Sequence, residues 1–335
     1  MNYSQYSPKT VEDIIRLRRR IAQSGIPEKV TDVNLIVGTW NVQAFGGFYN
    51  GWDETKGSPK RNLRGLASIA EIIRLYDVIA LQEVKRDTSG LRFLLSEFLG
   101  SDWDVLLSDV TAGDKGNTER MAFIYDTRRV RPSGLAGEIV LPPASRAGPV
   151  EQFDRTPYMA SFSAGGMKFT LISAHIRYGS IPEDRLAEIT AVANFTADEI
   201  QKRINETSEE RNPIVLGDFN IDARGDNPLF QAFCSRGLFV PEQLNDLKTT
   251  YGTEPKFYDQ IAWFMGLLDM EFTGRCGVID FVGAVFPELS SIGMTFRASD
   301  HFPLWAEFSI DRSIVQMARV LGVDPNAPLP FVDIV

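Results

Sequence analysis

The segment "IVLGDFNID", residues 214–222, sets a short apolar run directly against polar residues. A run of this kind after Pro213 is typical of a strand that is covered on both faces. Asp218 and Asn220 are two residues apart, so their side chains point to the same side of an extended chain. One interpretation is a turn, in which Asp and Asn bind their own backbone. The other is a functional site at a strand end, positioned by a rigid sheet.

Composition narrows the class of protein. The chain has 335 residues, of which 44% are hydrophobic, and a formal net charge of −9. Its length suggests about two domains, although two-layer folds of this size often form one. The acidic balance argues against a non-specific basic nucleic-acid-binding protein, but it allows an enzyme that meets phosphates through a metal. Cys234 and Cys276 predict neither a disulfide framework nor a zinc site.

The N-terminal residues lack the apolar region of a signal peptide, and no stretch approaches the length of a membrane span. We therefore expect no stable insertion into a membrane. The expected compartment is the cytoplasm, or the cell exterior if a signal peptide has been removed from the chain. The oligomeric state stays open.

Strand-like runs alternate with helical patterns and with hairpin-like pairs along the chain. This mixture predicts an α/β protein with mixed sheets and helices on their outer faces. The strands are expected at 34–39, 78–82, 104–108, 121–125, 159–163, 168–174, 213–217, 258–264 and 303–309. Helices are expected at 10–24, 62–76 and 185–204, and a short one in the tail after Asp311.

Polar residues lie at or next to the ends of six of the apolar runs. They are Asn41, Glu83, His175, the pair Asp218 and Asn220, Asp259, and the pair Asp300 and His301. Each of them has a structural explanation on its own, as a turn, a cap or a core histidine. Together they favour one site, because the chain has only two histidines and both lie in these segments.

Two imidazoles with nearby carboxylates and amides suit hydrolysis assisted by a hard divalent cation. Magnesium takes oxygen ligands, often one or two carboxylates together with substrate phosphate. Zinc usually draws on more histidine or cysteine. A serine hydrolase is not indicated, because G-x-S-x-G does not occur.

The ordered residues resemble the endonuclease/exonuclease/phosphatase superfamily over roughly residues 34–309. The segments "LQEVKRD", "GNTERMAFIY" and "YDQI" are most similar to the deoxyribonuclease I branch. The resemblance implies a four-layer αββα sandwich of two mixed β-sheets with helices on the outer faces. It divides the chain into an N-terminal helical extension (1–33), the family domain (34–310) and a C-terminal strap (311–335).

The resemblance also implies roles for the residues. Glu83 is expected as the principal ligand of Mg²⁺ or Mn²⁺, with Ca²⁺ as an alternative, and Asn41 and Asp300 assist. His301 is expected to be oriented by Asp259, and His175 by Glu119, while the division of acid and base between the histidines stays open. Asp218 would orient or deprotonate water, and Asn220 would donate to phosphoryl oxygens.

The expected substrate is nucleic acid, with DNA favoured over RNA, and a small phosphoester is the alternative partner. Lys85, Arg86, Asn117 and Arg120 are expected to contact it. The main alternative function is a phosphatase or phosphodiesterase acting on a phosphoinositide, sphingolipid or small nucleotide, because "GTWNV" also resembles the inositol-phosphatase branch. An inactive binding module is a distant alternative.

Overall fold

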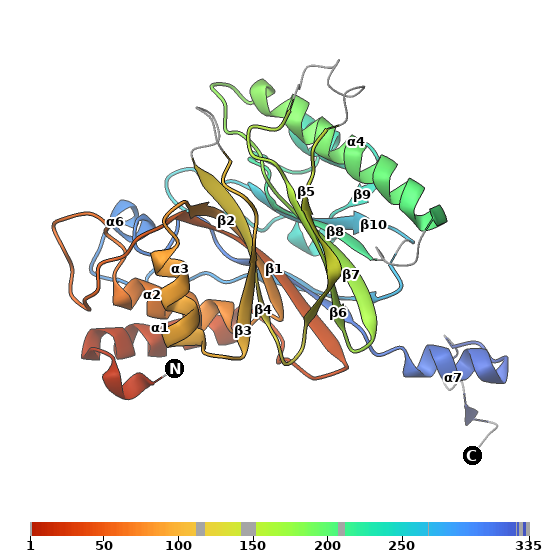
Figure 1. Cartoon of the computed structure of the whole chain (residues 1–335), viewed down its shortest axis with the longest axis horizontal. Coiled ribbons are helices and arrows are strands. Elements are labelled where there is room, and N and C mark those ends of the chain that lie inside the picture. Colours follow the sequence, from red (N-terminus) through yellow and green to blue (C-terminus); the bar gives the residue numbers. More distant parts are fainter. Residues whose placement is uncertain are drawn as a thin grey trace.

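Two mixed six-stranded sheets pack face to face in the computed structural model (Figure 1). The structure describes residues 2–111, 118–141, 152–206, 212–266, 268–325, 327 and 331–332, without the side chains of 199–206. The first sheet has the order β11 (Glu271–Val278), β12 (Leu304–Ser309), β1 (Asn34–Phe45), β2 (Val78–Lys85), β4 (Glu119–Asp126) and β3 (Trp103–Leu107). The second has the order β5 (Arg131–Glu138), β6 (Tyr158–Ala164), β7 (Met167–His175), β8 (Pro213–Asp218), β10 (Asp259–Phe264) and β9 (Leu238–Phe239).

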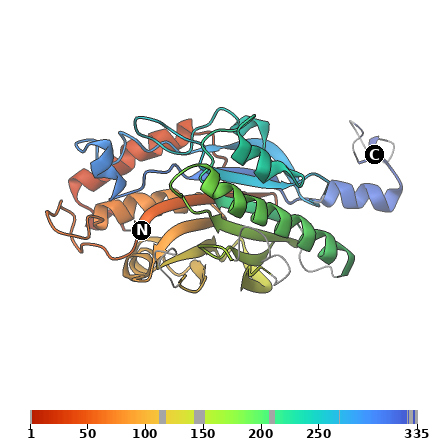
Figure 2. The ribbon, with the colours of Figure 1, turned by 90° about the horizontal axis from the view of Figure 1, so that it is seen from above.

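Helices cover the outer faces of both sheets, which completes the predicted αββα sandwich (Figures 1 and 2). The first sheet is covered by α1 (Pro8–Gln23) and α2 (Leu63–Ile73), and the second by α4 (Glu183–Glu206). Shorter helices are α3 (Ser89–Phe93), α5 (Pro228–Cys234), α6 (Ser291–Thr295) and α7 (Ser313–Leu321), together with a π-helical turn at Leu94–Leu99 and 3₁₀ turns at Tyr3–Gln5 and Glu242–Leu244.

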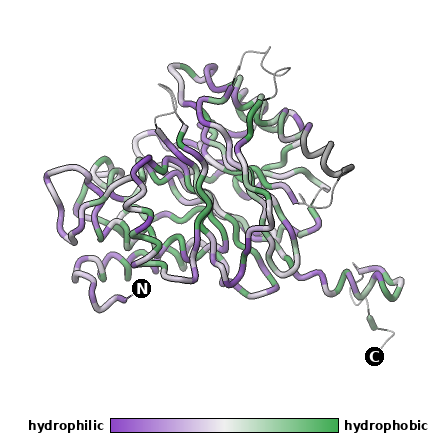
Figure 3. Tube along the Cα trace, in the orientation of Figure 1, coloured by the Kyte–Doolittle hydropathy of each residue, from purple (hydrophilic) through white to green (hydrophobic). Residues whose placement is uncertain are grey.

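Alternation along β1 distributes its side chains between two cores. Leu35 and Val37 belong to the core between the sheets, whereas Ile36 and Trp40 belong to the core beneath α1 and α2. This follows from the two-residue period of a strand. The strands therefore form the hydrophobic centre of the molecule, with hydrophilic residues toward the loops (Figure 3). A strand of this kind is buried on both faces and reads as a continuous apolar run.

The N-terminal helix packs onto the domain through a buried ion pair. Every residue of α2 is buried, and α1 lies against it. Asp13 of α1 is fully buried and accepts hydrogen bonds from Arg64 of α2 at 2.7 and 2.9 Å. Burying such a pair requires both partners, since either charge alone would lose its hydration without compensation. Helix α1 is therefore structurally tied to the sandwich.

The tail contains the short helix that the sequence predicts after Asp311. Helix α7 projects from the body of the molecule, and of its residues only Ala318 is buried (Figure 1). Most of the segment beyond residue 325 lies outside the described residues. Within the described residues, no helix is both long and apolar enough to cross a membrane.

All nine predicted strands are present, with ends shifted by a few residues. Strands β5, β9 and β11 were not predicted. Strands β5 and β11 lie at sheet edges and carry mostly exposed, glycine-containing sequences, and β9 has only two residues. An edge strand buries little surface and needs no apolar run. Helix α2 ends at Ile73 rather than at residue 76.

Candidate active site

The second sheet places three candidate residues in one row. In the pairing of β7, β8 and β10, Asp218 stands opposite both His175 and Asp259. Directly opposed residues project from the same face of a sheet, so the three side chains are neighbours. All three are buried. The carboxyl end of β8 therefore holds a carboxylate between an imidazole and a second carboxylate.

Gly217 makes this row possible. Its φ is +137°, and a Cβ atom at this position would lie 2.0 Å from the carbonyl oxygen of Ala174 on β7. Only glycine tolerates both the backbone conformation and the close approach. The glycine of "GDFN" thus lets β7 and β8 run together up to the site.

The first sheet contributes Asn41 and Glu83. The amide Nδ2 of Asn41 lies 2.9 Å from Oδ2 of Asp218 and 3.2 Å from Oε1 of Glu83. The other carboxylate oxygen of Glu83 accepts a hydrogen bond from the backbone N–H of Ala44 at 2.9 Å. Asn41 therefore links the carboxylates of the two sheets.

Unusual backbone conformations surround this link. Ala44, Glu83 and Asn220 all have positive φ, at 48°, 62° and 50°. Residues other than glycine seldom adopt this conformation, which costs on the order of 1–3 kcal/mol each and is often found at functional sites. At Glu83 it coincides with an irregularity in the pairing of β2 with β4. The three residues lie at or near the ends of β1, β2 and β8.

His301 enters from the loop before β12. Its Nδ1 lies 2.7 Å from Oδ2 of Asp259, and its Nε2 lies 3.8 Å from Oδ2 of Asp218. Ser299 fixes the loop, because its hydroxyl donates to the carbonyl of Asn41 at 2.5 Å and accepts from the N–H of His301 at 2.9 Å. Burial alone would lower the pKa of His301, but the charges of Asp259 and Asp218 outweigh it and raise this pKa to about 10.

His175 meets the same oxygen from the other side. Its Nε2 lies 3.6 Å from Oδ2 of Asp218, and its Nδ1 lies 3.2 Å from Oε2 of Glu119. Burial would raise the pKa of Glu119, but His175, Arg155 and Lys85 together hold it at about 2. Asp218, also buried, has its pKa lowered by the charges of His301 and His175. Both imidazoles thus converge on one ionised carboxylate.

Asn220 closes this part of the site. Its backbone N–H donates to Oδ1 of Asp218 at 2.9 Å, and its side-chain Nδ2 donates to the carbonyl of Ile176 at 2.7 Å. One amide hydrogen is therefore committed to holding the loop after β7. The second amide hydrogen remains the one that could reach a substrate oxygen.

Of the four residues predicted to contact the substrate, the three that the structure describes lie in different surroundings. Nζ of Lys85 forms an ion pair with Glu119 at 2.8 Å, so its charge is already compensated inside the site. Arg86 is exposed. Arg120 is bound to the carbonyl of Ser108 at 3.0 Å, and alternation along β4 sends it to the face opposite Glu119. Asn117 lies outside the described residues.

Three oxygen groups fit a hard divalent cation. Oδ1 of Asn41 is buried without a hydrogen-bond partner among the described residues, next to the carboxylate of Glu83. The carboxyl group of Asp300 lies close enough to Glu83 and Asp218 for their charges to add to burial in raising its pKa. In the described part of the chain no three His, Cys, Asp or Glu side chains could hold a metal by themselves. Magnesium needs only one or two carboxylates when substrate and water complete its shell.

Two arginines at the site were missed by sequence reasoning. Arg155 donates from Nε to Oε2 of Glu119 at 2.7 Å. Arg61 is buried. It donates to the carbonyl of Gln43 near the end of β1 and to the carbonyl of Ala298 in the loop before β12. Neither ends an apolar run, and only the tertiary contacts identify them. For Arg155, its position just before β6 is the one available signal.

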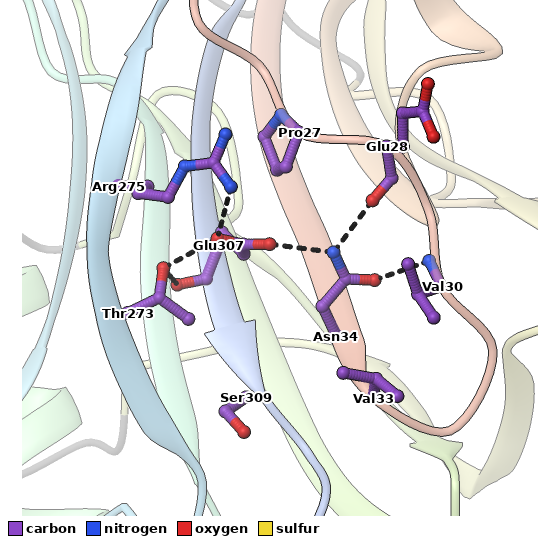
Figure 4. Close-up of a pocket in the computed structure, with 9 residues that line it drawn as sticks. All are labelled: Pro27, Glu28, Val30, Val33, Asn34, Thr273, Arg275, Glu307 and Ser309. Carbon is purple, nitrogen blue, oxygen red and sulfur yellow. Dashed lines mark hydrogen bonds and ion pairs between the residues drawn. The ribbon is translucent and has the colours of Figure 1, made fainter.

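A hollow lies at the end of the sandwich away from the histidines, where β1 starts and β12 ends (Figure 4). It has a volume of about 340 Å³. Its central carboxylate, Glu307, accepts from Asn34 at 2.7 Å and from Thr273 at 2.8 Å, and Arg275 lies 3.5 Å away. This acid is fully compensated, and neither histidine lines the hollow. Its chemistry does not resemble that of the histidine cluster.

Sequence comparison places the site in a known context. The profile of the Endonuclease/Exonuclease/phosphatase family matches residues 38–301, which include both histidines and the acids of the site, Glu83, Glu119, Asp218, Asp259 and Asp300. The chain belongs to this family. Members of the family are hydrolases of phosphoester bonds and generally use divalent metal ions. None of the curated proteins matches the sequence.

Solved structures of the family share the fold at low sequence identity. The human Nocturnin catalytic domain with bound sulfate has a TM-score of 0.55 and 17% identity, covering 87% of this chain and 98% of that one. D. rerio TDP2 complexed with single strand DNA product has a TM-score of 0.52 and 16% identity, covering 82% and 98%. The mannosyl-6-phosphatase Bt3783 of Bacteroides thetaiotaomicron has a TM-score of 0.51 and 17% identity, covering 82% and 99%.

Proposed function

We propose that this protein is a divalent-metal-dependent phosphodiesterase, a nuclease that cleaves DNA by in-line attack of water on phosphorus. The observation that carries the proposal is the convergence of both Nε2 atoms on Oδ2 of Asp218, at 3.6 Å for His175 and 3.8 Å for His301. A carboxylate between two imidazoles provides groups for both ends of the reaction, the attacking water and the leaving oxygen.

The contacts of each residue determine the role that we propose for it. Asp218 is ionised and orients the attacking water, with Asn41 fixing the same oxygen at 2.9 Å. His301 is held cationic by Asp259 and stabilises the charge that develops on the phosphoryl group. His175 donates a proton to the leaving oxygen, and Glu119 lies 3.2 Å from its other ring nitrogen, Nδ1.

The bound cation would be held by Glu83 and by Oδ1 of Asn41, with the carboxyl group of Asp300 close enough to Glu83 to feel its charge. It would neutralise negative charge on the phosphoryl oxygens. The protein itself supplies hydrogen-bond donors around the phosphoryl group. Removing one such donor typically costs on the order of 10²–10³-fold in kcat.

A small phosphoester is the second candidate substrate, and one observation favours it. Lys85 and Arg155 are both paired with Glu119, so these two cations offer less charge to a long phosphate backbone than the sequence suggested. Relatives of the same fold act on both classes, since their names include a DNA complex and a sugar phosphatase. The likeness in fold therefore does not choose between them.

The test is a substrate panel with a matched metal-site variant. Plasmid DNA, RNA, a phosphoinositide, a nucleotide and a hexose phosphate would each be incubated with Mg²⁺ and with chelator. We expect Mg²⁺-dependent nicking of DNA, abolished by chelator and by Glu83→Gln, which keeps the shape of the side chain without its charge. Glu254→Gln changes a carboxylate that is 82% exposed and serves as the control.

Binding of the cation can be followed without turnover. Mg²⁺ or Mn²⁺ should raise the Tm of the wild-type protein and of the control, because a ligand that binds only the folded state stabilises it. Glu83→Gln should lose this rise. Full DNA hydrolysis in chelator would contradict the metal dependence, and cleavage of the hexose phosphate alone would contradict the nuclease assignment.

A further inference from the structure

An exposed tyrosine stands beside the catalytic cluster. Tyr178 follows His175 by three residues, in the loop between β7 and α4, and it is 58% exposed. Its ring is covered on one side by the guanidinium of Arg185, whose Cζ lies 4.4 Å from the ring centroid. A large aromatic side chain that stays exposed next to a reaction centre is a candidate for substrate contact.

Arg185 holds this ring rigidly. Its side chain is only 4% exposed, and its Nε donates to the carbonyl of Tyr178 at 2.7 Å. Its Nη1 donates to the carbonyl of Asn220 at 2.7 Å and to Asp222 at 2.8 Å. The same guanidinium therefore fixes Tyr178 and the backbone of Asn220. A ring that is already ordered loses little conformational entropy when it binds a ligand.

Tyr258 extends the aromatic surface toward the reaction centre. Its ring packs edge-on against Tyr178, with centroids 6.3 Å apart and an interplanar angle of 76°. Its centroid also lies 6.0 Å from the ring of His301. The rings thus form a continuous path from His301 outward to the exposed face of Tyr178.

We propose that Tyr178, backed by Arg185 and flanked by Tyr258, stacks against a nucleobase of the substrate, next to the phosphoester that is hydrolysed. This inference rests on the proposed function and names the part of the substrate that the enzyme recognises. Every base has a flat π-face, and stacking on an aromatic side chain is tolerant of sequence. The site would therefore favour nucleotide substrates without selecting one base.

A sugar or inositol ring fits this surface less well. Such rings present hydroxyl groups that need hydrogen-bonding partners. Arg185 has its Nε and Nη1 bound to protein acceptors, so these two atoms are not free to bind such hydroxyl groups. The rings of Tyr178 and Tyr258 therefore offer a flat, polarisable surface to a ligand rather than hydrogen-bonding groups.

The kinetic test compares two esters that differ in the base. Thymidine 5′-(p-nitrophenyl phosphate) carries a nucleobase and methyl p-nitrophenyl phosphate does not, while both release p-nitrophenol. Tyr178→Ala should lower kcat/KM for the thymidine ester about 5- to 100-fold more than for the methyl ester. Tyr178→Phe and Tyr178→Trp should keep the wild-type ratio. Val320→Ala, on the projecting helix α7, is the control for an exposed apolar side chain.

Equal losses on the two esters, or no loss on either, would overturn the stacking proposal. A binding experiment separates this failure from a failure of the proposed function. Calorimetry with thymidine 5′-monophosphate and with deoxyribose 5-phosphate needs no turnover. The wild type should bind the nucleotide more tightly, and Tyr178→Ala should remove that difference. Equal binding of the two ligands by the wild type would overturn the inference, whatever the enzyme hydrolyses.

Discussion

Asn41 is hydrogen-bonded to Asp218 across the two sheets, with 2.9 Å between Nδ2 of the amide and Oδ2 of the carboxylate. Asn41 lies on β1 of the first sheet, and Asp218 ends β8 of the second. The geometry of the site therefore depends on how the two sheets pack. Three of the predictions below concern the site around this bond, and the fourth concerns a buried carboxylate far from it.

The two histidines should behave as one catalytic unit. His175→Asn and His301→Asn each keep an amide near the position of Nδ1, beside the carboxylate partners Glu119 and Asp259. Each change should lower kcat by about 10²- to 10⁴-fold, the usual contribution of general acid–base assistance. The double variant should lose less than the product of the two, because both imidazoles act through Asp218.

Steady-state kinetics and circular dichroism on the three variants provide the measurement. Normal turnover per folded molecule together with a lowered Tm would indicate a structural role for the histidines and contradict their assignment. Fully multiplicative losses would show that the two imidazoles act independently.

Asp259→Asn should lower the pKa of His301 in the metal-free protein. Burial opposes protonation of this imidazole, and the charge of Asp259 is the largest influence that favours it, giving a pKa of about 10. A raised folded-state pKa stabilises the protein below the unfolded value, near 6.5, and this stability is lost as pH rises through about 10. In Asp259→Asn this contribution to stability should be lost at a lower pH than in the wild type.

The measurement is an NMR titration of the imidazole protons, which is simple because the chain has two histidines and His175→Asn assigns them. An unchanged titration of His301 in Asp259→Asn would show that Asp218 alone controls its charge.

Arg61 should act as a positioning residue for the acidic side of the site. It donates to the carbonyls of Gln43 and Ala44 on one segment and of Arg297 and Ala298 on another, at 2.8 to 3.2 Å. These segments carry the N–H that holds Glu83 and the loop that carries Asp300. Arg61→Met should therefore raise the Mg²⁺ concentration needed for half-maximal activity, and Arg61→Lys should restore it only in part, since lysine cannot span all four acceptors.

Metal titrations of activity and of Tm give the readout for Arg61. Arg236→Met is the matched control, because Arg236 is 42% exposed and pairs with Asp198 on the surface. A lowered Tm with an unchanged Mg²⁺ requirement would reduce Arg61 to a purely structural residue.

Asp126 should contribute to stability against acid, far from the site. It ends β4 and accepts hydrogen bonds from Lys29 at 2.8 Å and from Arg128 at 2.7 and 2.8 Å. Burial would raise its pKa, but these donors outweigh burial and hold it at about 2. Its stabilisation is present above the unfolded value, near 3.9, and is lost as pH falls toward 2.

In Asp126→Asn the free energy of unfolding should fall less between pH 5 and pH 2 than it does in the wild type. Urea unfolding at several pH values measures this slope, with Glu254→Gln as the exposed control. An identical pH dependence in Asp126→Asn and wild type would contradict the assignment.

Much of the fold could be predicted because the core strands are covered on both faces. Runs such as 35–38 and 213–217 are apolar without interruption, as expected for strands that are covered on both faces, and each is followed within a few residues by a polar residue of the site. The edge strand β5 escaped prediction, because its alternately exposed residues carry no such signal. The projection of α7 could not be read from its sequence either, since an apolar stripe does not reveal what the helix packs against.

The sequence by itself determined the parts of the site: two histidines and a set of acids and amides at strand ends, in an order that resembles one family. What only the tertiary structure decided is how these parts meet. The 41–218 bond, the pairing of Lys85 with Glu119 rather than with an open surface, and the buried Arg61 all join segments far apart in the chain. Local sequence patterns set backbone conformation and burial, whereas such contacts depend on the register and packing of whole sheets. For this physical reason the chemistry could be anticipated from the residues, but the electrostatic state of each group could not.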